Sequence, residues 1–388
     1  MSERFLAAAA AFETWIRDRA LPLWADRGFD TEAGAFVERL LPDGTPDLES
    51  PTRVRVQARQ LFVYAAAHHL GWHTAARERI ASTLAFLERV AARDGGRRGY
   101  ASRVHARRGE VVDHRLDLYD TAFLILAFAW CHRAFGLQSA RSRAEWLIEL
   151  IDRELACDFG GWREGDYPAP HRRQNPHMHL FEAFLALYDA TGEARHLARA
   201  GEICALFETR FFDPRRDVLR EFFAEDLTPA PGAAGDSVEP GHMMEWTWLL
   251  GQYEDRSGHP LQRYATRLYA RGLEMGLDRQ SGLLYDEVDA DGAVRQATKR
   301  CWPMTEWIKA ALSQARRGRD GALDQAAAAI EALMRHYLDC AAVPGAWIDR
   351  RGPNGEVVDA HAPASTFYHL FVAAMEAHAY AQRFAQSG

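Results

Sequence analysis

Lysine is nearly absent from this chain of 388 residues, because only Lys299 and Lys309 among its 47 basic residues are lysines. This scarcity leaves few candidates for a Schiff-base lysine or a phosphate-loop lysine. An excess of positive charge is also missing, since 54 acidic residues give a formal net charge of −7. We therefore expect neither a nucleic-acid partner nor an anionic membrane partner, because both normally require a basic face.

Paired cysteines and long apolar runs are missing as well. The five cysteines are widely spaced and form no CxxC pair, so neither a zinc site nor a disulfide framework is expected. The longest apolar run, 121–131, is too short to cross a bilayer. The segment 1–20 carries charges within its apolar stretch, which is typical of a helix rather than a secretory signal. We expect a globular cytoplasmic protein.

A short pattern typical of a β-hairpin recurs along the whole chain. Each copy has a glycine or a turn, a few extended residues, a polar turn, and extended residues again. Successive copies begin 65, 62, 57, 64 and 63 residues apart, which is too regular an interval for chance. The copies begin at Gly34, Gly99, Gly161, Val218, Gly282 and Gly345.

Two helical segments separate each hairpin from the next. In these segments apolar residues recur at i, i+3, i+4 and i+7, and the helix-favouring residues alanine and leucine dominate. The pattern predicts twelve helices in six pairs. The predicted helices are 4–27, 54–71, 74–92, 117–135, 139–156, 176–191, 194–210, 240–256, 259–277, 301–316, 320–340 and 363–384.

A repeat of this kind cannot bury its apolar face alone, so it must stack on its neighbours. An open solenoid used as a scaffold would need polar repeats at its two ends, but the last helix is as apolar as the middle ones. We therefore predict an all-α fold in which residues 1–388 form a single (α/α)6 barrel domain. Six helical hairpins would make the ring, with short β-hairpin loops at one end.

The helix that follows each hairpin begins with polar or aromatic residues that a barrel of leucine and alanine does not need. Such groups are costly to bury unless they are paired. Six distant segments that bring them to one end of the barrel predict a lined pocket and favour an enzyme. The residues are Arg59, Asp117, Tyr119, Asp120, Asn175, His177, His179, His242, Glu245, Trp302, Glu306, His361 and His369.

His242 and Glu245 stand three residues apart, on one face of a predicted helix. A carboxylate beside a histidine fixes its tautomer and raises its pKa, which prepares it for proton transfer. The same pair could instead ligate a metal, with His179 or His369 completing the site. The residues alone leave both interpretations open.

Arg59 and Trp302 have two interpretations each. Arg59 shares a helical face with Arg55, which often means a solvated stripe, but the apolar LFVYAAA follows it directly. A fixed guanidinium there could stabilise an oxyanion. Trp302 precedes a proline suited to the first turn of a helix, and its ring could stack on a sugar or simply fill the core.

At these residues the sequence resembles the N-acylglucosamine 2-epimerase superfamily, and within it the mannose isomerase and sulphosugar isomerase branch more than the cellobiose 2-epimerases. One difference is Pro303, where many relatives carry a second tryptophan, and this departure weakens the case for stacking a disaccharide. The matching segments, in order, are QARQLFVYA, DLYDTAFLILA, NPHMHLFEAFLALYDATG, PGHMMEWTWLL, KRCWPMTEWIKA and TFYHLFVAAMEA.

The resemblance implies an enzyme that moves protons on a reducing monosaccharide without a metal or other cofactor, as a monomer or homodimer. Carried over by motif, the catalytic residues are His242, His369, Arg59 and Glu245. His369 and His242 would be the acid–base pair, and Glu245 would orient His242. The substrate-binding residues would be His179, Asn175, Tyr119, Trp302, Glu306 and Asp117.

The predicted reaction is an aldose–ketose isomerisation of the mannose–fructose type through a cis-enediolate. The main alternative is a sugar 2-epimerase, of the mannose–glucose or N-acylglucosamine type. A phosphorylated or sulphonated sugar is a further alternative, with Arg172 and Arg173 as anion contacts. A glycoside hydrolase would need two carboxylates across the scissile bond, and a non-catalytic sugar-binding protein would exchange no protons.

Overall fold

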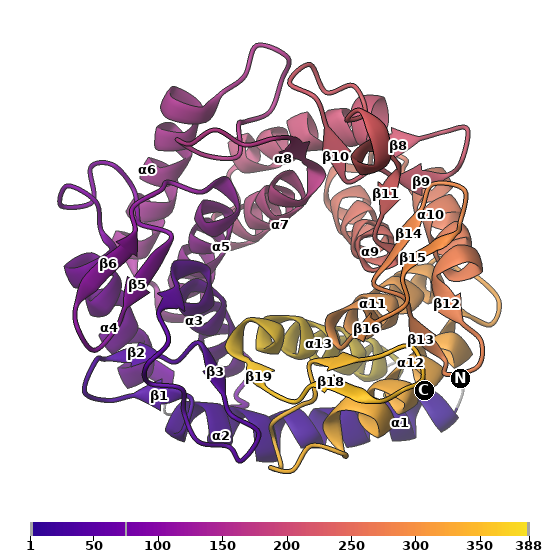
Figure 1. The fold of residues 1–388 in the computed structure, drawn as a ribbon, viewed down its shortest axis with the longest axis horizontal. Helices are drawn as coiled ribbons and strands as arrows, with labels where there is room; N and C mark the ends of the chain where they lie inside the picture. Colours follow the sequence, from indigo (N-terminus) through magenta and orange to yellow (C-terminus); the bar gives the residue numbers. More distant parts are fainter. Residues whose placement is uncertain (1–2, 74–75, 386–388) are drawn as a thin grey trace.

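The computed structural model describes residues 3–73 and 76–385. Six helices form an inner ring in which each packs against the next, and the last packs against the first (Figure 1). The predicted closed (α/α)6 barrel is therefore confirmed. The inner helices are α3 (Val54–His69), α5 (Leu118–Phe135), α7 (Gln174–Thr191), α9 (Pro240–Ser257), α11 (Trp302–Arg316) and α13 (Ala364–Ala385).

An outer layer of helices surrounds this ring (Figure 1). These helices are amphipathic and bury one face against the inner ring, as the α-helical periodicity predicts. The first helix packs against both α12 and α13, so the start of the chain covers its last inner helix. The outer helices are α1 (Glu3–Trp15), α2 (Leu21–Asp26), α4 (Ala76–Phe86), α6 (Gln138–Leu155), α8 (Ala194–Leu206), α10 (Gln262–Gly276) and α12 (Ala322–Leu333).

The predicted helices agree closely with those observed, apart from π-helical turns that the sequence pattern does not reveal. Such turns extend four of the outer helices, and one of them joins α1 to α2 within the predicted segment 4–27. None of the helices in the described ranges is long and apolar enough to cross a membrane. The π-helical turns are Ile16–Ala20, Leu87–Ala91, Phe207–Phe211 and Met334–Leu338, and a 3-10 turn spans Gly232–Asp236.

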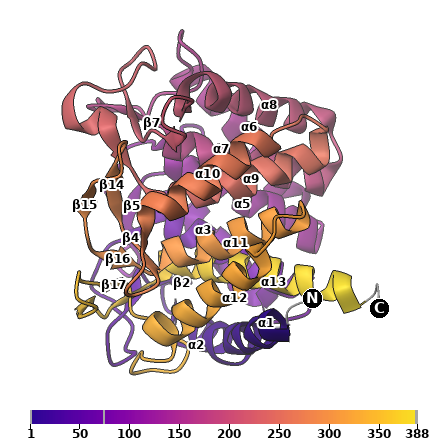
Figure 2. The ribbon, with the colours of Figure 1, turned by 90° about the vertical axis from the view of Figure 1, so that its right-hand side faces the viewer.

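Short strands lie at one end of the barrel, on the left in Figure 2. In five of the six units, the strand before an inner helix pairs with a strand in the loop of the next unit. Before α5 there is only an isolated bridge, between Asp117 and Gly165. The last of these pairs, β19 with β3, aligns Ala362 with Leu40 and closes the ring. The strands before inner helices are β4 (Thr52–Arg53), β7 (Arg172–Arg173), β11 (Ser237–Val238), β16 (Lys299–Arg300) and β19 (Ala362–Pro363).

The remaining strands belong to the hairpin loops themselves, as the repeated pattern predicts. Each pairs antiparallel with a neighbour. They are β1 (Phe29–Asp30), β2 (Ala35–Phe36), β3 (Arg39–Leu40), β5 (Arg103–His105), β6 (Glu110–Asp113), β8 (Phe212–Asp213), β9 (Val218–Leu219), β10 (Phe222–Phe223), β12 (Leu277–Asp278), β13 (Leu283–Leu284), β14 (Glu287–Asp289), β15 (Val294–Gln296), β17 (Arg350–Arg351) and β18 (Val357–Asp359).

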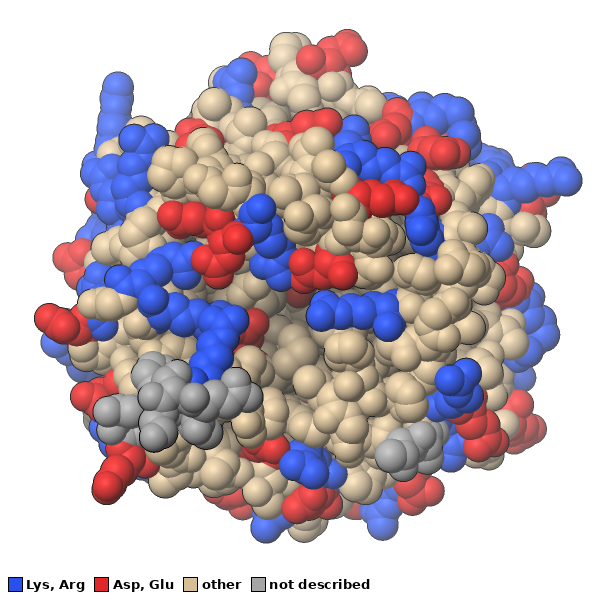
Figure 3. All heavy atoms as spheres, turned by 180° about the vertical axis from the view of Figure 1, so that it is seen from behind, with Lys and Arg blue, Asp and Glu red and all other residues tan. Residues whose placement is uncertain are grey.

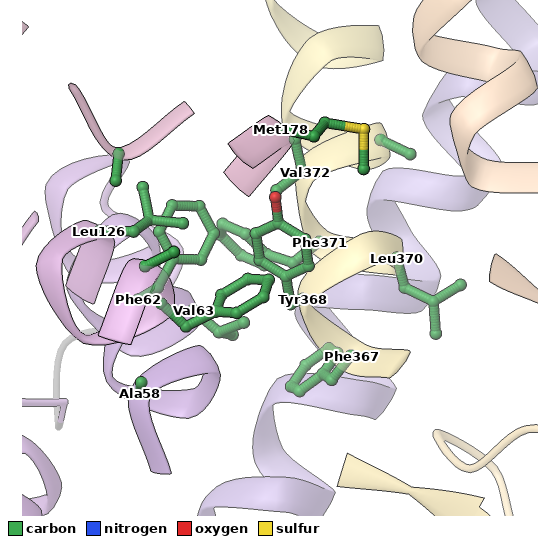
Figure 4. Close-up of a cluster of buried hydrophobic side chains, with 14 of the residues drawn as sticks. Ala58, Phe62, Val63, Leu126, Met178, Phe367, Tyr368, Leu370, Phe371 and Val372 are labelled. Atoms are coloured by element: carbon green, nitrogen blue, oxygen red, sulfur yellow. The ribbon is translucent and has the colours of Figure 1, made fainter. Parts of the chain in front are cut away.

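Apolar side chains of the inner helices fill part of the barrel's middle. Figure 4 shows Phe62 of α3 and Tyr368 of α13 facing one another, with Leu126 of α5 beside them. The rings of Phe62 and Tyr368 lie edge to face, with centroids 5.3 Å apart. This packing closes the interior of the barrel below its strand end.

The opposite end of the barrel differs in character. A cavity of about 290 Å³ lies there, and many of its lining side chains are apolar, among them Leu126, Trp130, Trp248 and Met375. Figure 3 shows this face, with acidic and basic side chains interspersed around a central hollow. The polar residues that the sequence analysis singled out belong instead to the strand end.

Candidate active site

A cavity of about 280 Å³ opens among the strands and the first turns of the inner helices. All six inner helices contribute to its wall, as the repeat pattern predicts. Eight of the ten predicted site residues line it, and Glu306 and Asp117 do not. The lining residues are Arg53, Arg59, Tyr119, Asn175, His179, Glu239, His242, Glu245, Arg300, Trp302, Asp349, Arg350, Pro363, Ser365, Thr366 and His369.

His242, on the first turn of α9, is held by a carboxylate from another segment. Its Nδ1 lies 3.0 Å from Oε2 of Glu221 and 3.9 Å from Oε2 of Glu239. Burial opposes a charge on the ring, but these two carboxylates outweigh it and raise the pKa of His242 to about 9. His242 therefore carries a proton at neutral pH.

The expectation that Glu245 orients His242 is wrong. Helical spacing places the two residues near one another, yet Glu221 accepts the hydrogen bond from His242. Glu221 also accepts one from the side chain of Gln174, which fixes its orientation. It lies in the loop between β9 and β10, and no motif in the sequence singles it out.

His369, near the start of α13, has the opposite protonation state. Its Nδ1 lies 2.8 Å from Oε1 of Glu306. Burial and the positive charges of Arg59 and Lys309 lower the pKa of His369 well below its ordinary value. The neutral ring donates from Nδ1 to Glu306, which leaves an unprotonated Nε2 for the cavity.

Trp302 stands between these two histidines. Its ring centroid lies 5.1 Å from that of His242 and 5.4 Å from that of His369. An indole face is a good surface for the C–H groups of a sugar ring. A sugar on Trp302 would therefore lie beside one charged and one neutral histidine.

Arg59, on α3, also lines the cavity. Its guanidinium donates to the carbonyl of Ser365 at 3.0 Å and to the hydroxyl of Tyr119 at 2.7 Å. The ring of Phe123 lies 4.1 Å from its central carbon and supports the group from one side. Among the described residues, no carboxylate pairs with Arg59, so its charge remains available to an oxyanion.

A network of buried charges lies beneath the cavity. Nζ of Lys309 lies 2.6 Å from Oε2 of Glu306 and 4.0 Å from Oε1 of Glu245, and these three side chains are almost entirely buried. Neither carboxyl oxygen of Glu245 has a hydrogen-bond partner in the described structure. Burial and the nearby charge of Glu306 raise the pKa of Glu245 to about 8.

Glu306 therefore has a different place from the one predicted. The sequence analysis expected it to bind substrate, but it lies behind His369, between that ring and Lys309. Lys309 itself was missed. The signal for it was present, since it is one of two lysines and lies in an otherwise apolar stretch, three residues after Glu306.

Asp117, which was predicted to bind substrate, is also engaged elsewhere. Its carboxylate caps α5 by accepting from the backbone N–H of Asp120, and it accepts from the hydroxyl of Tyr167 at 2.5 Å. His177 is buried against the backbone of Trp162 and does not reach the cavity. His361 pairs with Asp359 outside the cavity.

Several of these groups lie close enough together to hold a metal ion. One set combines Glu245, Glu306 and His369, and another combines Glu221, Glu239 and His242. In the first set Lys309 already supplies a cation to the carboxylates. A metal ion in the first set would therefore have to compete with this ammonium.

Comparison with known proteins identifies the family. The family model described as N-acylglucosamine 2-epimerase (GlcNAc 2-epimerase) matches residues 34–373. A mannose-6-phosphate isomerase of Rhizobium meliloti (strain 1021) is 37% identical over 371 residues, which cover 93% of this chain and 94% of the relative.

Two solved structures share the fold. A D-mannose isomerase superposes with a TM-score of 0.85 at 21% identity, over 95% of this chain and 97% of the other. A cellobiose 2-epimerase from Spirochaeta thermophila DSM 6192 superposes with a TM-score of 0.86 at 23% identity, over 98% of each chain.

Proposed function

The chain belongs to the N-acylglucosamine 2-epimerase family, whose relatives are sugar isomerases and 2-epimerases, and we propose that it is an aldose–ketose isomerase of the mannose–fructose type. The observation that carries this proposal is the pair of histidines beside Trp302, one of them neutral and the other charged at neutral pH. A base and an acid on one sugar are the requirements of enolisation.

The proposed reaction begins with opening of the sugar ring. The charged His242 donates a proton to the ring oxygen O5, the C1–O5 bond breaks, and the proton of the O1 hydroxyl returns to His242 as C1 becomes the aldehyde carbon. His369 then removes the C2 proton at Nε2. The electron pair of that C–H bond forms a C1–C2 double bond, and the negative charge develops on O1. Arg59 stabilises this cis-enediolate by its fixed charge.

His369 completes the isomerisation by delivering to C1 the proton at Nε2, which exchanges with solvent while the enediolate exists. The proton of O2 passes to O1, so O2 becomes the ketose carbonyl and O1 becomes the hydroxyl of C1. Each acid–base group of this kind typically contributes about 10²–10⁴-fold to the rate. Glu306 keeps His369 in the tautomer that leaves Nε2 free, and Glu221 keeps His242 charged. No metal enters the proposed steps.

A 2-epimerase is the second candidate, because the two histidines come from different helices, α9 and α13, and both line the cavity. In that reaction the second proton would reach C2 from the opposite face. The similarity to a mannose-6-phosphate isomerase over 93% of the chain favours isomerisation.

The test is NMR of mannose, glucose, lyxose, N-acetylglucosamine, cellobiose and mannose 6-phosphate, each incubated with the protein in deuterated water. We expect a ketose with deuterium at C1. Deuterium at C2 of an epimer, without ketose, would replace isomerase by 2-epimerase. No product and no exchange with any sugar would refute both.

A further inference from the structure

A group of three side chains with metal-binding atoms lies beside the outer helix α8. One ligand atom from each of Cys204, Glu208 and His259 lies within 4.8 Å of the other two. Cys204 is on α8, Glu208 is in the π-helical turn that follows it, and His259 is in the connection between α9 and α10. The group therefore brings together two neighbouring helical hairpins of the ring.

This group is separate from the candidate active site. None of its three members lines the cavity at the strand end. His242 is on the first turn of α9, whereas His259 follows the end of that helix, and at about 1.5 Å per residue the helix separates its two ends by about 22 Å. What the group binds can therefore be tested apart from the reaction.

Cys204 forms the buried side of the group. Only 2% of this residue is exposed, and among the described residues none makes a hydrogen bond with its thiol. Burial, together with the negative charge of Glu208, raises the pKa of the thiol to about 12, so the sulfur keeps its proton at neutral pH. A metal ion binds the thiolate, and it would therefore displace this proton.

His259 and Glu208 form the side that solvent reaches. Nε2 of His259 lies 3.1 Å from Oε2 of Glu208, and 45% of the His259 side chain is exposed. The backbone N–H of His259 donates to Oγ of Ser257, and its ring lies edge to face with that of Tyr253. The imidazole is thus held beside the carboxylate, where an ion can enter from solvent.

Four other groups of this kind occur among the described residues, and a cation of the chain already contacts a carboxylate in each. Glu208 differs, because in the described structure its ion-pair partner is His259 and neither an arginine nor a lysine contacts it. A metal ion beside α8 would not have to compete with a fixed positive charge. The cations in the other groups are Arg141 and Arg195 at Glu193, Arg300 at Glu239, and Lys309 at Glu245 and Glu306.

We propose that Cys204, Glu208 and His259 bind one zinc ion, with water completing a tetrahedral site. Zinc accepts thiolate sulfur, imidazole nitrogen and carboxylate oxygen as ligands at about 2.0–2.3 Å. At these bond lengths tetrahedral ligand atoms lie about 3.3–3.8 Å apart, so the three side chains need to approach by about 1 Å. Magnesium and calcium take oxygen ligands, which disfavours them here.

The zinc ion would join α8 to the connection between α9 and α10. No CxxC pair marks such a site in the sequence, because its ligands come from two different hairpins. An ion that binds the folded chain and not the unfolded chain stabilises the fold as its free concentration rises above Kd. We therefore expect the Tm to rise with zinc concentration.

The test adds cobalt and then zinc to the whole chain after chelation and gel filtration. Cobalt commonly replaces zinc, and its bond to a thiolate produces a charge-transfer absorption band in the near ultraviolet. One equivalent of cobalt should produce this band, and zinc should remove it. Cys204→Ser should lack the band. His259→Ala should weaken zinc binding by at least the about 10–100-fold that loss of an outer-shell partner costs.

Cys340→Ser is the matched control, because Cys340 is an exposed thiol that belongs to none of the groups. This variant should keep the cobalt band, and zinc should raise its Tm as in the wild type but should not raise that of Cys204→Ser. Because His259 is exposed, His259→Ala tests the site without disturbing the core.

Four results would overturn the proposal. They are a wild type without the cobalt band, a band that persists in Cys204→Ser, a band that is lost in Cys340→Ser, and equal zinc affinity in His259→Ala and the wild type.

Discussion

Nζ of Lys309 lies 2.6 Å from Oε2 of Glu306, and neither side chain is exposed to solvent. The other carboxylate oxygen of Glu306 binds Nδ1 of His369. The ammonium therefore holds a buried negative charge in place directly behind the proposed base. Lys309 acts as a positioning residue, since it does not line the cavity at the strand end.

Replacing Lys309 by methionine should therefore damage both stability and activity. Leaving one member of a buried ion pair alone typically costs about 3–5 kcal/mol, and Glu306 would escape this cost by taking up a proton. His369 would then lose its charged acceptor. We expect a lower Tm and a large fall in kcat with a smaller change in KM.

The double variant Lys309→Met/Glu306→Gln separates these two effects. It removes both charges, so much of the lost Tm should return. Activity should stay low, because the neutral amide that replaces the carboxylate of Glu306 cannot hold His369 in the same way. If activity returned together with Tm, Lys309 would have a purely structural role.

Each of the two histidines should be essential for isomerisation on its own. His369→Ala and His242→Ala should each reduce isomerisation by about 10²–10⁴-fold, the usual contribution of an acid–base group. Exchange of the C2 proton in deuterated water should be lost in His369→Ala. Unchanged Tm values would show that the fold survives, and retained exchange in both variants would refute the assignment.

The profile of kcat/KM against pH should show a broad plateau and a fall at alkaline pH. His369 must be neutral, so activity falls only as pH decreases through its lowered pKa. His242 must be charged, so activity falls as pH rises through about 9. Measurement of kcat/KM across pH tests both limbs, and an alkaline limb near pH 6.5, the ordinary pKa of histidine, would contradict the role of His242.

Glu221 and Glu245 should affect that alkaline limb to different extents. Glu221→Gln removes the carboxylate that contacts His242, so the pKa of His242 falls and the limb moves to lower pH. Glu245→Gln should shift the limb less, because Glu245 acts on that ring only from a distance. The reverse order of shifts would restore Glu245 as the partner of His242.

Chelation tests the proposed absence of a metal from the reaction. Incubation with EDTA followed by gel filtration should leave kcat unchanged, because the charges at the site are supplied by Arg59, His242 and Lys309. Loss of activity that a divalent ion restores would instead point to the carboxylate and histidine sets beneath the cavity.

The repeat made the fold predictable. A hairpin every 57–65 residues and a fixed helix phase after it were enough to place Arg59, His242, Trp302 and His369 at one end. The hydrogen-bond partners of the site residues were harder to predict. Spacing along one helix pointed to Glu245 as the partner of His242, whereas His242 donates its hydrogen bond to Glu221 in the preceding loop.

The pair of His369 and Glu306 shows the same limit. The residues are 63 positions apart, about one repeat, and they meet because α11 and α13 are neighbours in the ring. A single sequence carries no signal for the rotation of one helix against the next. Side-chain partners across helices therefore require the three-dimensional structure.

The pairing of β19 with β3 and the packing of α1 on α13 have a consequence for chain connectivity. Every unit, including the first and last, has a neighbour on both sides, so a cut in a loop between two helices removes none of the helix–helix contacts of the ring. A circular permutant opened at Gly258, the glycine that ends α9 with a positive φ, and joined through a linker between the original ends should assemble the same pocket.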